Sequence, residues 1–136
     1  MFRQIDQVTL NEVARIYDEF GDLYDELIND FYQKLQEPGE LDRYKLQLNE
    51  EFKKPSGELK KSKDNFKIAY GKLLENKDIK HLEEMINHLW NLILSLNELI
   101  SISGKFKAKI MKETLEKYKT PFTEKFERLN SLMKNF

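Results

Sequence analysis

Residues 79–100, IKHLEEMINHLWNLILSLNELI, decide the fold. Branched aliphatic residues follow one another here at steps of three and four, with isoleucine and leucine alternating: Ile79, Leu82, Ile86, Leu89, Ile93, Leu96 and Ile100. This spacing places all of them on one stripe of a single helix, which has about 3.6 residues per turn. The sequence therefore predicts a long, deeply buried helix over residues 79–102.

A second apolar stripe predicts a helix over residues 10–36. Its members again alternate at steps of three and four: Leu10, Val13, Tyr17, Phe20, Tyr24, Leu27 and Phe31. Just before them, Thr9 and Glu12 have the spacing of a capping box, and Val8 and Val13 have that of a hydrophobic staple. We therefore expect the helix to begin at this cap and to end before Pro38-Gly39, because neither residue continues a helix comfortably.

The segment 41–76 carries a weaker stripe with an interruption. Leu41, Tyr44, Leu48 and Phe52 start the stripe, and Pro55-Ser56-Gly57 then interrupts it. The pattern resumes in phase, because residues 52, 59, 66 and 73 are all apolar and lie seven apart. We predict a helix over 41–76 with a break at 55–57, and the pattern leaves open whether it forms one helix or two.

The last segment, residues 105–135, keeps helical spacing straight through a proline. Its stripe consists of Met111, Leu115, Tyr118, Phe122, Phe126, Leu129, Met133 and Phe136. Pro121 lacks the N–H that would bond the carbonyl of Lys117, so we expect a kink near this residue. A new helix with Thr120 as its N-cap is the alternative.

Four helical segments of similar length, joined by short turns, are typical of antiparallel neighbours. We therefore predict an all-α fold, an up-and-down antiparallel four-helix bundle, as a single domain over residues 1–136. Charge differs between the segments: residues 1–36 carry three basic and eight acidic side chains, 41–77 carry ten and six, and 105–136 carry nine and four. Acidic helices beside basic ones favour correct helix pairing without any ligand.

The composition excludes several classes of protein. Cysteine is absent, which excludes a disulfide framework, a thiolate metal site and a cysteine nucleophile. The first ten residues have no apolar h-region, so we expect no signal peptide. The most apolar window, residues 85–102, is interrupted by polar side chains, which disfavours a membrane span. We expect a cytoplasmic protein.

Three residues of the third segment have a spacing that a metal site could use. His81, Glu84 and His88 lie at i, i+3 and i+7 of the predicted helix, on adjacent turns. The chain has no other histidine, and the Glu-x-x-His motif of di-iron bundles does not occur. We interpret the three as a solvated helix face and expect neither a metal nor another cofactor.

Catalytic motifs are missing from the sequence. Serines are scattered, and neither a Gly-x-Ser-x-Gly elbow nor a Walker loop accompanies them. Carboxylate pairs such as Glu83-Glu84 are adjacent and diverge on a helix. We expect a protein that is not an enzyme, with no catalytic residues and no small-molecule substrate.

Lysines gather in two clusters. The first covers residues 53–63 and contains Lys53, Lys54, Lys60, Lys61 and Lys63. The second covers residues 105–112, with Lys105, Lys107, Lys109 and Lys112 at the expected start of a helix, where cations oppose the helix dipole. A polyanion, either a nucleic-acid backbone or an anionic membrane surface, would explain both clusters. Nucleic acid is the weaker case, because the chain has only four arginines.

The leading hypothesis is a protein that binds other proteins. The apolar stripes are wider than one packing seam requires, and surplus apolar surface usually indicates association. Trp90 and Leu94 flank the stripe of the third helix, and tryptophan is enriched at interfaces. We expect a role in protein–protein interaction or scaffolding, a homodimer, and contact with the partner through Trp90, Leu94, Lys105, Lys109 and Lys112. Polyanion binding through the lysine clusters is the alternative.

Overall fold

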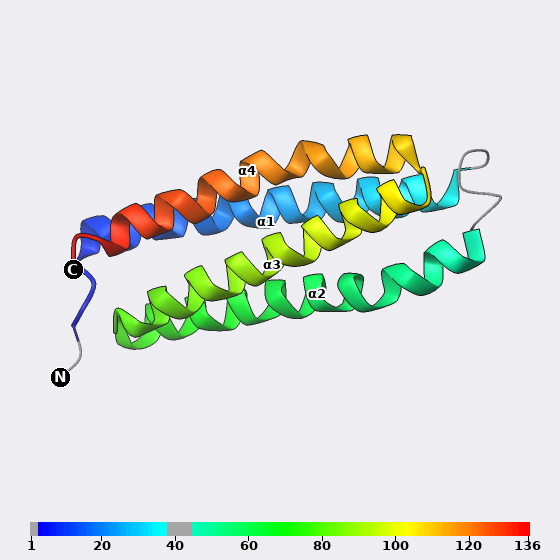
Figure 1. Cartoon of the computed structure of the whole chain (residues 1–136). Coiled ribbons are helices and arrows are strands. Elements are labelled where there is room, and N and C mark those ends of the chain that lie inside the picture. The colour runs from blue at the N-terminus through cyan, green and yellow to red at the C-terminus, as the bar shows by residue number, and fades with distance from the viewer. Residues whose placement is uncertain (1–2, 38–44) are drawn as a thin grey trace.

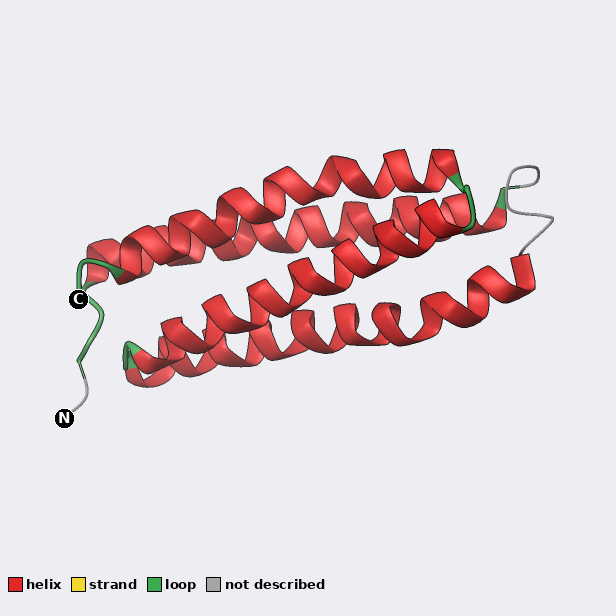
Figure 2. Ribbon diagram, in the orientation of Figure 1, coloured by secondary structure: helices red, strands yellow, loops and turns green. Residues whose placement is uncertain are grey.

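The computed structural model describes residues 3–37 and 45–136, and four helices make up most of these ranges. They are α1 (Gln7–Gln36), α2 (Lys45–Asn76), α3 (Lys80–Lys105) and α4 (Lys109–Met133). Successive helices run in opposite directions, and the start of α1 and the end of α4 lie at the same end of the bundle (Figure 1). Short loops and turns account for the other described residues (Figure 2). The predicted all-α, up-and-down four-helix bundle is confirmed.

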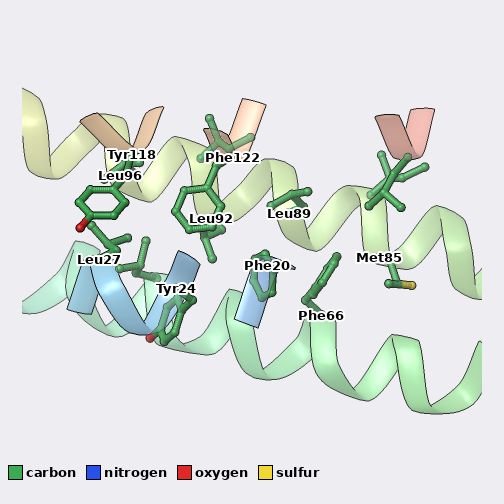
Figure 3. Close-up of a cluster of buried hydrophobic side chains, with 14 of the residues drawn as sticks. Phe20, Tyr24, Leu27, Phe66, Met85, Leu89, Leu92, Leu96, Tyr118 and Phe122 are labelled. Atoms are coloured by element: carbon green, nitrogen blue, oxygen red, sulfur yellow. The ribbon is translucent and has the colours of Figure 1, made fainter. Parts of the chain in front are cut away.

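One hydrophobic core runs along the bundle axis, and all four helices contribute to it. Figure 3 shows part of it, with Phe20 of α1, Phe66 of α2 and Phe122 of α4 among the labelled side chains. Phe20 packs on both partners, with ring centroids 4.2 Å from Phe66 and 5.7 Å from Phe122. The aromatic residues predicted for the stripes of three different helices therefore meet in the core.

The start of α1 differs from the predicted cap. Asp6 is the N-cap, and its carboxylate accepts a hydrogen bond of 2.7 Å from the amide of Thr9. The helix then begins at Gln7, so the predicted capping box is wrong. Val8 is 81% exposed, whereas Ile5 and Leu10 are buried at the two positions of a hydrophobic staple. Asp6 and Thr9 are both suitable N-caps by residue type. The burial of Ile5, the residue before Asp6, favours Asp6.

The second helix continues through Pro55, so the predicted break at 55–57 is wrong. Pro55 is buried between Phe52 and Leu59 on the core-facing stripe of α2. Pro55 has no backbone N–H to donate to the carbonyl of Glu51, so one helical hydrogen bond is lost. Burial of the proline ring in the core offsets that loss. Residues 45–76 therefore form one helix and not two. Residues 41–44, which the prediction included, lie outside the described residues, as does Pro38-Gly39.

The fourth helix also continues through its proline. Pro121 lies inside α4, and the alternative of a new helix capped by Thr120 is wrong. The predicted kink stays a prediction. The start of α4 is later than expected, because residues 106–108 form the turn and Lys107 takes a left-handed φ of 57°. The sequence predicted that the third helix ends at residue 102, but Ser103 and Gly104 still belong to the last turn of α3.

Most apolar side chains of α3 that lie outside its central stripe are buried in the core. Met85, Leu92 and Leu99, which widen the stripe on one flank, are fully buried because α3 packs against α2 as well as α4. Among the large apolar side chains of α3, only Trp90 and Leu94 are about half-exposed. No helix in the described part of the chain combines the length and apolarity that a membrane crossing requires.

Candidate functional site

Large aromatic rings fill the seam between α1 and α2. Tyr17 stacks on Tyr70 with ring centroids 4.0 Å apart, and Phe31 meets Phe52 at 5.3 Å. Rings of this size hold two helix backbones further apart than leucine or alanine would. A wide seam of this kind leaves room at its outer edge.

A groove occupies that outer edge between the second half of α1 and the first half of α2. It consists of two hollows of about 620 Å³ and 420 Å³. Phe31 and Tyr32 on α1 and Lys53 and Ser56 on α2 line both hollows, so the groove is continuous. We call it the α1–α2 groove.

The floor of the α1–α2 groove is apolar. Phe31 lies at its centre, with Phe52 and Leu59 on the α2 side, and all three are buried. Tyr32 is 51% exposed on the α1 side, although it is a large aromatic residue. Apolar surface that stays in contact with water in this way is stabilised when a partner covers it.

One wall of the groove is basic. Lys53, Lys60 and Lys63 of α2 all line it, and among the described residues no aspartate or glutamate lines the groove. These residues belong to the first lysine cluster predicted from the sequence. Lys54 and Lys61 of that cluster are exposed and do not line the groove.

Tyr24 connects the basic wall to the core. The ammonium of Lys63 lies 5.4 Å from the centre of the Tyr24 ring, a cation–π contact between α2 and α1. Burial raises the pKa of the Tyr24 hydroxyl to about 12, with the nearby charge of Asp64 adding to the shift. The hydroxyl is therefore neutral at physiological pH and leaves the positive charge of the wall unreduced.

Ion pairs join α1 to α4 instead. Arg128 of α4 bonds Glu19 at 2.9 Å and Glu12 at 3.2 Å, and Lys125 lies 3.9 Å from Glu19. Acidic α1 is thus paired with basic α4, as the charge pattern predicts. No ion pair joins α1 to α2 within residues 3–37 and 45–136. The lysines of the groove wall are therefore not neutralised across their own seam.

The residues predicted to contact a partner lie away from this groove. Trp90 is 44% exposed, and its ring packs on Phe126 of α4 with centroids 5.1 Å apart. Leu94 is 47% exposed and lines a more polar hollow between α3 and α2, beside Asn91 and Glu98. The two form a small apolar surface, and a role for it in binding stays a prediction.

The second lysine cluster is divided by the turn between α3 and α4. Lys105 ends α3, where the helix dipole favours a cation, and bonds Glu51 of α2 at 2.9 Å. Lys112 lies 3.9 Å from Glu116, one helical turn further on. The argument that this whole cluster opposes a helix dipole is therefore wrong, since only Lys109 and Lys112 lie in the first turn of α4.

The histidines of α3 have different surroundings. His81 is buried, so the prediction of a solvated face is wrong for it, and its Nδ1 lies 3.2 Å from Glu84. His88 lines the hollow between α2 and α3. Burial holds the pKa of His88 below its usual value, although the nearby Glu84 charge acts the other way. In the described ranges, no three acidic or histidine side chains are arranged to hold a metal ion.

The sequence pointed to the lysines of the groove and placed Phe31, Phe52 and Leu59 in apolar stripes, but it did not show that a groove lies over them. Tyr32 and Ile28 lie beside the predicted stripe of α1 and widen it toward α2, which is the signal that was available. Ser56 and Gly57 were interpreted as a helix break, although they are the small residues that leave the groove open.

Comparison with known proteins gives no match: no family model fits the chain, and no curated protein or solved structure is detectably similar to it.

Proposed function

We propose that this protein is a non-enzymatic helical bundle that acts in protein–protein interaction in the cytoplasm, and that the α1–α2 groove receives the partner. The observation that carries the proposal is the continuous apolar floor of the groove beside the exposed ring of Tyr32. Aromatic anchors next to apolar hollows are typical of the energetic centres of protein interfaces.

The size of the groove supports a protein as its occupant. It extends from Tyr24 to Gln36 on α1 and from Asn49 to Lys63 on α2. At about 1.5 Å of rise per residue, each wall is roughly 18–21 Å long. This length suits a short segment of a partner protein.

The groove supports the proposal better than the surface around Trp90. Phe126 already covers part of the Trp90 ring, and the neighbours of Leu94 in its hollow are mainly polar. The α1–α2 groove instead offers an apolar floor beside the exposed ring of Tyr32.

Polyanion binding is the second candidate function. One observation favours it: three lysines line the same wall, and no carboxylate from the described part of the chain lines the groove. Its weakness is that Lys105 and Lys112, from the second cluster, each have a carboxylate neighbour within this chain.

Site-specific photo-crosslinking in cells of the source organism tests the proposal. Benzoylphenylalanine replaces Tyr32 in one variant and Ile68 in another, since both side chains are about half-exposed, at 51% and 55%. Ile68 lies on α2 outside the groove, so it serves as the matched control. Mass spectrometry then identifies each crosslinked peptide.

We expect a discrete protein adduct from position 32 that position 68 does not give. Equal adducts from both positions, or none from position 32, would contradict a protein-binding groove. An adduct of two copies of this chain would support self-association through the groove, the homodimer expected from the sequence.

A further inference from the structure

We propose that the partner segment in the α1–α2 groove is an acidic amphipathic helix of a different protein. This inference rests on the proposed function, because it names the chemistry of the partner that the same groove would take. It starts from the charge of the lining residues within 3–37 and 45–136, which include Lys53, Lys60 and Lys63 and no aspartate or glutamate.

The neighbours of these lysines leave most of their charge available. Lys53 lies 2.9 Å from Glu50, but both side chains are largely exposed, so solvent screens the pair. Lys63 approaches the carboxylate of the adjacent Asp64 only to 3.5 Å. Lys60 has no carboxylate within ion-pair distance in the described part of the chain. A partner with carboxylates would complete this wall.

No carboxylate of α1 lies within ion-pair distance of these lysines in the described part of the chain. Glu12 and Glu19 bond Arg128 in the seam with α4, and Asp30 accepts a hydrogen bond from Tyr118 of α4. The charge of Asp25 acts on the Tyr24 hydroxyl but makes no ion pair with the basic wall among the described residues, so acidic groups of the partner would meet these lysines from outside.

The shape of the groove favours a helix over an extended segment. An extended backbone on an apolar floor needs hydrogen-bond partners for its N–H and C=O groups, and the α1 and α2 backbones use theirs within the helices. A helix satisfies its own backbone groups and can present an apolar stripe to the floor. The groove length of roughly 18–21 Å corresponds to three or four helical turns, or about 12–14 residues.

The lysine spacing indicates where the partner's carboxylates lie. Lys53 and Lys60 are seven residues apart on α2, which is about 10.5 Å, or two turns. A helix alongside α2 matches them with glutamates at i and i+7 on one flank of its apolar stripe. The aliphatic stems of the lysines can extend the apolar floor while the ammonium groups stay at the rim.

A second copy of this chain does not offer such a helix. α1 is its most acidic helix, but the apolar stripe of α1, including Phe20 and Leu27, is buried in its own core. A flat membrane surface would contact the rim lysines and leave the apolar floor uncovered. A helix of another protein covers both at once.

Fluorescence anisotropy with labelled peptides of 14 to 18 residues (about four to five turns) tests this inference. The first peptide is a leucine/glutamate amphipathic helix with glutamates at i and i+7. The second has lysine in place of glutamate, and the third keeps the composition of the first but scatters its leucines around the helix. The triple variant K53Q/K60Q/K63Q removes the basic wall. The matched control K54Q/K61Q/K72Q removes the same charge from the same helix outside the groove.

We expect the first peptide to bind the unmodified protein, and K53Q/K60Q/K63Q to weaken that binding about tenfold or more. The control variant should change it less than threefold, and the other two peptides should bind at least tenfold more weakly. Equal loss in both triple variants, or equal binding of the scattered peptide, would overturn the inference. Tighter binding to phosphatidylglycerol vesicles or single-stranded DNA, lost in K53Q/K60Q/K63Q, would overturn it in favour of a polyanion.

The two proposals fail separately. An adduct with another protein at position 32, combined with no binding of the acidic peptide, would overturn the acidic helix and leave the proposed function standing. No adduct at position 32 together with no peptide binding would overturn both.

Discussion

The ammonium of Lys63 on α2 lies 5.4 Å from the ring centre of Tyr24 on α1, which places a basic wall residue directly over the core edge of the groove. This contact joins the two helices where no ion pair does within the described residues. It also orients one lysine of the wall, because a cation favours the face of an aromatic ring.

The contact between Lys63 and Tyr24 should be measurable as a coupling. In a double-mutant cycle with K63M and Y24L, we expect a coupling energy of about 0.5–1 kcal/mol, as found for partly exposed cation–π pairs. Urea unfolding of the four proteins gives the value. The pair K67M and Y24L is the control, and an equal coupling there would show that the effect is not specific to this contact.

Phe66 should be the most sensitive position of α2. It is fully buried and packs on both Tyr17 and Phe20, so F66A should lower the free energy of unfolding by about 3–5 kcal/mol. I68A, two residues further on an exposed position, should change it by less than about 0.5 kcal/mol. Chemical denaturation followed by circular dichroism measures both, and similar losses would contradict the described face of α2.

The periodicity of the sequence was enough to predict four helices, their order and most of the core. The Ile/Leu stripe of 79–100 became the inner face of α3, and the in-phase residues Phe52, Leu59, Phe66 and Leu73 of α2 are all buried. Periodicity works because burial of one face is the dominant stabilising term for such helices.

Local signals were less reliable, because tertiary burial overrode them. Pro55 should end a helix by its own chemistry, yet its ring lies on the buried stripe, and the helix continues. The α1–α2 groove could not be predicted, since it depends on how far rings such as Phe31 and Phe52 hold the two helices apart. That separation results from packing between residues distant in sequence.

Gly57 should be a position where the protein can gain stability. It lies in the interior of α2, and a Cβ added there would meet no atom within 4 Å. We expect G57A to raise the free energy of unfolding by about 0.5–1 kcal/mol, because alanine loses less backbone entropy in a helix. Thermal unfolding checks this, with G71A on the same helix as a second open site. A loss of stability in G57A would show that α2 is strained near Pro55.

The ion pairs between α1 and α4 should depend on salt. Glu19 is shared by Arg128 and Lys125, so E19Q and R128M should show a coupling of about 0.5–1 kcal/mol at low ionic strength. Screening should reduce the coupling at 1 M NaCl, where the Debye length is about 3 Å. A coupling that is unchanged by salt would indicate packing of the Arg128 stem and not charge.

His88 should make stability depend on pH near neutrality. Burial lowers the pKa of His88 in the folded protein, so at pH values below about 6.5 the unfolded chain binds a proton that the folded protein still excludes. The contribution to stability is complete above that pH and is lost as the pH falls toward the folded pKa. We expect the free energy of unfolding to be smaller at pH 5.5 than at pH 7.5, and H88Q to show a smaller decrease. The two proteins differ only at residue 88, so an equal decrease in H88Q would contradict the assignment to His88.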